Sequence, residues 1–137
     1  MRAWFLMWAV VISSILPTAQ EKTTVGDFTK SPTEHIINQI EQPFVVRSIK
    51  GIVSRKTEGP TEPLAKVLFE IQGPGTDRKI RRTSTDEKGR FKMGNVPEGT
   101  YRFKATLNGF QSVMGTITVS KEALKTDELK IAMPIGV

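Results

Sequence analysis

The chain has 137 residues, of which 38% are hydrophobic and 25% are charged, and its formal net charge at pH 7 is +6. This length suits one domain with a single hydrophobic core, with too little chain for a catalytic domain beside it. There is no cysteine and only one histidine. That composition excludes disulfides, iron–sulfur sites and thiol nucleophiles, and it leaves too few ligands for a zinc site.

Residues 1–19 are predicted to be a signal peptide. Arg2 supplies a minimal positive charge, an apolar run follows it, and Pro17 and Ala19 precede Gln20 in a pattern typical of leader cleavage. The apolar stretch is shorter than the ~20 residues that span a bilayer as a helix. A cleaved leader is therefore favoured over an uncleaved anchor. We expect export to the periplasm or the medium, with no transmembrane segment after leader removal.

Residues 20–43 are predicted to be a linker followed by a short helix. Ser31 and Glu34 have the spacing of a capping box, and Pro32 occupies the first helical position between them. Three isoleucines then recur at helical spacing: Ile36, Ile37 and Ile40. A helix this short is marginal alone in water. It is expected either to pack on its own domain through the isoleucine face or to bind a partner.

Residues 44–137 are predicted to form an all-β domain. Tyr101, Phe103 and Ala105 alternate with polar neighbours, which is typical of a half-buried strand. Similar patterns recur at residues 45–53, 67–71, 117–119 and 129–133, with weaker strand signals at 79–85 and 90–94. About seven short strands without a long helix predict an antiparallel Greek-key β-sandwich of the prealbumin or immunoglobulin type.

Two turn motifs separate the strands in the middle of this domain. Asp86 and Gly89 form an Asp-x-x-Gly turn, because the aspartate can bond its own backbone and glycine tolerates positive φ. Pro97 and Gly99 repeat that logic before Tyr101.

The order of these landmarks resembles the carboxypeptidase regulatory-like domain family. Its pattern corresponds here to Gly51-Ile52-Val53, an apolar strand at 67–71, and the segments 85–91, 96–101 and Gly109-Phe110. The resemblance spans about residues 46–134. It implies a small transthyretin-like sandwich, also described as carbohydrate-binding-like, of the stand-alone secreted bacterial type. It further implies a non-catalytic binding or structural role at the cell envelope, with carbohydrate recognition by the sandwich loops as the alternative.

The excess positive charge is concentrated in one predicted hairpin. Residues 78–92 contain two acidic residues against seven basic ones, which form a candidate anionic-ligand surface: Arg78, Lys79, Arg81, Arg82, Lys88, Arg90 and Lys92. Two interpretations stay open. Basic residues on an edge strand prevent aggregation between sheets, whereas a positive surface attracts anionic partners. For an exported protein we expect an envelope protein, an anionic glycan or a lipid head group as the partner, and no nucleic acid.

Candidates for chemistry are few. His35 lies on the predicted helix outside the sandwich, which is a poor support for a catalytic triad. Asp86 and Glu87 are a candidate calcium pair, although turn formation explains Asp86 by itself. Neutral sugars are usually stacked on exposed aromatic rings. Phe110 is the one aromatic residue of the mature domain whose position after a turn favours exposure, whereas the family resemblance implies that it is packed. We therefore expect no enzyme activity, no catalytic residue, no metal and no cofactor.

Overall fold

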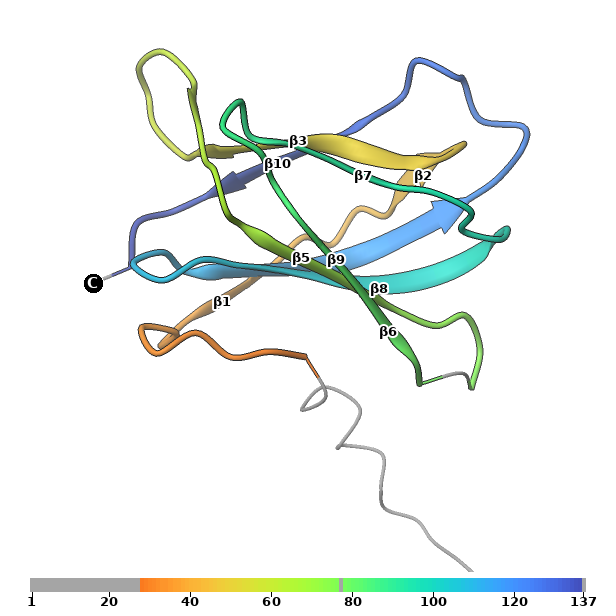
Figure 1. The fold of residues 1–137 in the computed structure, drawn as a ribbon, viewed down its shortest axis with the longest axis horizontal. Coiled ribbons are helices and arrows are strands. Elements are labelled where there is room, and N and C mark those ends of the chain that lie inside the picture. Colours follow the sequence, from red (N-terminus) through yellow and green to blue (C-terminus); the bar gives the residue numbers. More distant parts are fainter. Residues whose placement is uncertain (1–27, 77, 137) are drawn as a thin grey trace, which may run out of the picture.

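The computed structural model describes residues 28–76 and 78–136, so the predicted signal peptide and the beginning of the linker lie outside the described residues. All regular structure in these two ranges is β (Figure 1). In chain order the strands are β1 (Ile37–Gln39), β2 (Phe44–Val46), β3 (Ile49–Arg55), β4 (Glu62–Pro63), β5 (Leu68–Gln72), β6 (Ile80–Ser84), β7 (Arg90–Met93), β8 (Gly99–Thr106), β9 (Ser112–Val119) and β10 (Leu129–Met133).

The strands form two layers that pack face to face (Figure 1). The six-stranded sheet, called sheet A, has the order β1-β9-β8-β5-β6, and β2 also pairs with β9. The four-stranded sheet, called sheet B, has the order β10-β3-β4, and β7 also pairs with β3. The prediction of an all-β sandwich is confirmed.

Two details of the strand prediction are corrected by the pairings. The described residues hold ten strands instead of about seven, because short strands form at β1, β2 and β4. The sheets are mixed and not purely antiparallel, since β1 and β2 run parallel to β9, and β10 runs parallel to β3. Parallel neighbours cannot be joined by a tight hairpin, and the members of each parallel pair here are far apart in the chain. Residues 120–128 carry the chain from β9 in sheet A to β10 in sheet B.

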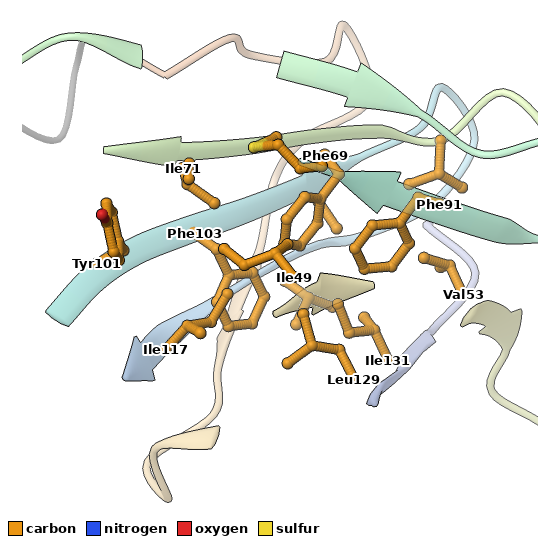
Figure 2. Packing of buried hydrophobic residues seen from close by; sticks show 14 of the residues in the cluster. Ile49, Val53, Phe69, Ile71, Phe91, Tyr101, Phe103, Ile117, Leu129 and Ile131 are labelled. Atoms are coloured by element: carbon orange, nitrogen blue, oxygen red, sulfur yellow. The ribbon is translucent and has the colours of Figure 1, made fainter. Parts of the chain in front are cut away.

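The core lies between the sheets and is organised around three phenylalanines (Figure 2). Phe69 and Phe103 come from sheet A and Phe91 from sheet B, and their ring centroids lie 4.2 Å apart for Phe69–Phe91 and 5.6 Å apart for Phe69–Phe103. Gly115 lies opposite Phe103 in the β8–β9 pair. A Cβ at Gly115 would lie 2.6 Å from the Phe103 ring, so glycine leaves the room that this ring occupies.

The turn predicted at Asp86 is confirmed in atomic detail. The Asp86 carboxylate accepts the backbone N–H of Lys88 at 2.8 Å and that of Arg90 at 3.0 Å. The Gly89 amide donates to the Asp86 carbonyl at 2.9 Å, and Gly89 has φ of +76°. This turn reverses the chain between β6 and β7 and places the two strands on different sheets.

The predicted short helix is wrong for the described residues. The bonds of its first turn do form, since the Glu34 amide donates to the Ser31 carbonyl at 3.0 Å. The chain then becomes extended as β1, and the Ile40 amide donates to the Met114 carbonyl of β9 at 2.8 Å. β-branched residues such as Ile37 favour strands, and the open edge of β9 satisfies their backbone groups. The segment thus packs on its own domain, as a strand.

Residues 28–34 cover the outer face of sheet A, on the side away from sheet B (Figure 1). Phe28 is buried there. The Lys104 ammonium lies 2.8 Å from the Glu34 carboxylate, and both side chains are less than 5% exposed. The Ser112 hydroxyl donates to the same carboxylate. Burial acts to raise the pKa of Glu34, but the bonds from Lys104 and Ser112 outweigh it, so this pKa lies below its ordinary value.

A second buried carboxylate completes this layer. Glu70 is fully buried and accepts the Thr29 amide and hydroxyl, each at 3.0 Å. It also pairs with Arg82 of β6 at 2.7 Å. The alternation in β5 and β8 places Glu70 and Lys104 on the outward, polar face, which the sequence pattern assigns to solvent. Both are buried because residues 28–34 lie over them.

Candidate functional site

An open groove lies where β6 and β7, the edge strands of the two sheets, approach each other. Its volume is ≈ 470 Å³, and it is lined by Lys50, Gly51, Thr83, Ser84, Asp86, Arg90, Phe91, Lys92 and Glu128. We call it the basic groove, because three of its lining residues are cationic and come from two paired strands.

The pairing of β3 with β7 places these cations. Lys50 of β3 lies directly opposite Lys92 of β7, and Arg90 lies two residues before Lys92 in β7. Phe91 and Met93 alternate with them and are buried in the core. Because side chains on a strand alternate between faces, Arg90 and Lys92 project outward with Lys50. Like charges directly opposite each other destabilise a sheet, so this pair by itself opposes folding, and a carboxylate or a bound anion beside it would relieve the repulsion.

The two acidic residues of the groove, Asp86 and Glu128, differ in how they are placed to neutralise these cations. Asp86 is committed to its turn, where the backbone N–H groups of Arg90 and Lys88 lower its pKa below the ordinary value. Glu128 lines the groove immediately before β10. The groove therefore combines three cations with two carboxylates and the hydroxyls of Thr83 and Ser84.

The seven residues of the predicted anionic-ligand surface do not form one surface. The expected single hairpin over residues 78–92 is wrong, because β6 pairs with β5 in sheet A and β7 pairs with β3 in sheet B. Arg90 and Lys92 reach the basic groove, while Lys88 lies in the turn between the strands. Arg78 and Lys79 precede β6 and are exposed.

Arg81 and Arg82 have structural partners. Arg81 donates to the Gly94 carbonyl at 2.6 Å and to the Asn95 carbonyl at 3.1 Å, which ties β6 to the loop after β7. Arg82 pairs with buried Glu70. Since Arg82 neutralises a buried carboxylate and Arg81 links β6 to the loop after β7, these two residues stabilise the sandwich.

Lys50 is the groove residue that the sequence reasoning missed. It stands between Ile49 and Gly51, which are buried, so strand alternation alone assigns it to the outer face. Its position opposite Lys92 depends on the β3–β7 register, and these residues are far apart in the chain.

The residues with side chains suited to catalysis or metal binding are poorly placed for either. His35 is exposed and lies in an irregular stretch before β1. No group of three or more His, Asp or Glu that could hold a metal ion occurs among the described residues. Nor does this part of the chain contain a helix able to span a bilayer.

Aromatic platforms for sugar stacking are missing from the described surface. Tyr101 is 2% exposed, and its hydroxyl donates to the Pro97 carbonyl at 2.6 Å. Phe110, for which the resemblance implies packing, is partly buried against the core and bridges to Ile135. The large hydrophobic residues that are exposed in residues 28–76 and 78–136 are all aliphatic.

Comparison with known proteins agrees with this architecture. A search of curated proteins finds no match to the chain. A family model described as the carboxypeptidase regulatory-like domain matches residues 48–134, from the residue before β3 to the residue after β10. This match covers more than half of the chain and the same landmarks that carry the resemblance, whereas β1 and β2 lie outside it. The chain therefore belongs to the carboxypeptidase regulatory-like domain family, whose domain is a non-catalytic β-sandwich module.

Proposed function

We propose that this protein is an exported binding module of the cell envelope, and that the basic groove binds the carboxylate or phosphate groups of an anionic envelope component. One observation carries the proposal: Lys50 and Lys92 oppose each other across β3 and β7, with Arg90 beside them. A bound anion would relieve the repulsion between these cations and form charge-assisted hydrogen bonds with them.

Protection of a sheet edge does not account for Lys50. Basic residues on an edge strand can block unwanted strand pairing. β3, however, is paired on both sides, with β10 on one and with β4 and β7 on the other. A lysine on this interior strand has no edge to protect. Ligand binding accounts for all three cations of the groove together.

Export is supported by the leader-like residues 1–19. Mass spectrometry of the native protein tests this part of the proposal. We expect a mature N-terminus near Gln20, and an intact segment of residues 1–19 would favour the anchored alternative.

Groove binding is tested with a Lys50→Gln/Lys92→Gln variant and a short oligogalacturonate, whose carboxylates stand in for the envelope polymer. Hydrogen bonds to charged groups contribute about 1.5 kcal/mol each at the lower end. The double substitution should therefore weaken binding about 100-fold in calorimetry. Thermal stability should not fall, because the substitution removes a like-charge pair.

The matched control is Lys56→Gln/Lys125→Gln, which changes the net charge equally at exposed positions outside the groove. This control should bind within about threefold of the native protein at low salt, because distant charges act only through the screened general field. Equal losses in the two double variants would mean that net charge, and not the groove, governs binding.

A further inference from the structure

β6 is an open edge of sheet A. It pairs with β5 on one side, and no described strand pairs with it on the other. The opposite edge of the same sheet is closed, because β1 and β2 lie along β9. The two edges of sheet A thus differ. Residues that precede the family domain pair with β9 at one edge, whereas the outer side of β6 at the other edge is open to an added strand.

The direction of the backbone groups on β6 follows from the ladder with β5. The Thr85 amide donates to the Val67 carbonyl at 3.0 Å, which places Thr85 at a hydrogen-bonded position. Such positions alternate in an antiparallel pair. Arg81 and Thr83 therefore face β5, whereas the N–H and C=O groups of Arg82 and Ser84 point away from the sheet. Among the described hydrogen bonds outside the strand ladders, none occupies the backbone groups of these two residues.

Cationic side chains lie along this edge. The Arg82 side chain is 50% exposed although its Nε pairs with Glu70, so half of its surface is accessible to a partner. Thr83 and Ser84 form the wall of the basic groove, across from Arg90 and Lys92. A strand laid beside β6 would therefore have cations near both of its faces.

We propose that β6 accepts an extended acidic segment of a partner protein as an added strand. The backbone of the segment would pair with the outward N–H and C=O groups of Arg82 and Ser84. Acidic side chains on one face would meet Arg82, and those on the other would meet Arg90 and Lys92 at the groove. This inference rests on the proposed function for the sign of the ligand's charge, and it names the ligand as an acidic polypeptide.

A second copy of the chain is a poorer occupant. β6 is five residues long with Arg82 at its centre. Antiparallel pairing of two β6 strands about that centre would place Arg82 opposite Arg82, and like charges directly opposite are destabilising. The two copies would also bring two strongly basic surfaces together. The edge therefore favours an acidic partner over itself.

The experiment uses capped peptides of alternating glutamate and valine, with a lysine–valine peptide of equal length as the charge control. Ser84→Pro removes an outward N–H and leaves the β5 ladder intact, since proline is tolerated on edge strands whose N–H faces solvent. Ser84→Val, which also loses the hydroxyl but keeps the backbone N–H, is the matched control. We expect the acidic peptide to bind the native protein, and to bind Ser84→Pro at least tenfold more weakly than Ser84→Val. The lysine–valine peptide should not bind.

A second measurement does not depend on the folding of a variant. Two N-methylated versions of the acidic peptide are used, one methylated at the odd-numbered and one at the even-numbered residues, so that each lacks the N–H groups on one of its two edges. At least one of these two peptides should fail to bind the native protein. The inference is overturned if both methylated peptides bind like the parent or if Ser84→Pro retains full affinity. It is also overturned if oligogalacturonate or anionic vesicles bind while the acidic peptide does not, a result that leaves the proposed function standing. Dimerisation of the native protein that Ser84→Pro abolishes would assign the edge to a second copy instead.

Discussion

Replacing Phe103 with alanine should lower the free energy of unfolding by about 3–5 kcal/mol, a large part of a typical domain stability of about 5–15 kcal/mol. Phe103 is fully buried at the centre of β8. Its ring packs against Phe69 and, at a centroid distance of 6.0 Å, against Phe44. The space beside it is already shaped by Gly115, so the neighbouring backbone has no side chain with which to fill the cavity.

Urea denaturation at neutral pH measures this loss. Phe110→Ala is the matched control, because Phe110 is a phenylalanine of the same domain that is only partly buried. It should cost clearly less than Phe103→Ala. A loss below about 1 kcal/mol for Phe103→Ala would mean that the inward face of β8 does not hold the core as described.

Replacing Glu34 with glutamine should cost about 3 kcal/mol, because it leaves the Lys104 ammonium buried without its charge partner. Both side chains are nearly inaccessible, and their N–O distance is 2.8 Å. A Glu34→Gln/Lys104→Met variant should recover much of the loss, since the second substitution removes the buried ammonium that the first leaves without its charge partner. If the double variant is no more stable than Glu34→Gln, the unpaired ammonium is not the cause.

The same pair makes stability depend on pH. The pKa of Glu34 in the folded state is below its ordinary value, so the unfolded chain takes up this proton first as the pH falls. The contribution of Glu34 is therefore complete above the ordinary glutamate pKa of about 4.3 and is lost as the pH falls through the lower folded value. Denaturation over this acid range should show a weaker pH dependence in Glu34→Gln than in the native protein.

The sandwich could be predicted because its signals are local. Asp86 and Gly89 encode their turn within four residues, and the alternation around Phe103 defines an inward face without reference to the rest of the chain. The family landmarks are turn and core residues of this kind. The strands that carry them form where the pattern places them.

The predictions from the sequence are wrong where a contact with residues far away in the chain determines the local structure. Ser31 and Glu34 close a single turn, but the chain does not continue as a helix, because Ile37 pairs with the edge of β9, far along the chain. The strand pattern predicts that Lys104 is exposed, but in the structure residues 28–34 lie over it and bury it. Neither contact can be predicted from a pattern of neighbouring residues in the sequence.

The candidate site was predicted only in part for the same reason. Arg90 and Lys92 are visible in the basic run of residues 78–92. Lys50 joins them only through the β3–β7 register. Arg82 looks like another surface cation in the sequence, yet its partner Glu70 is buried on the neighbouring strand.

An NMR titration of the isotopically labelled protein with oligogalacturonate tests the role of the basic groove most directly. We expect the backbone amides of Lys50, Gly51, Arg90 and Lys92 to shift first and to saturate together. Amides around the exposed Leu124 and Lys125 should stay unchanged. Raising the salt from 0.01 M to physiological strength should reverse the shifts, as the Debye length falls from ~30 Å to ~8 Å. Saturable shifts centred elsewhere, with the groove amides unmoved, would contradict the assignment of the groove as the binding site.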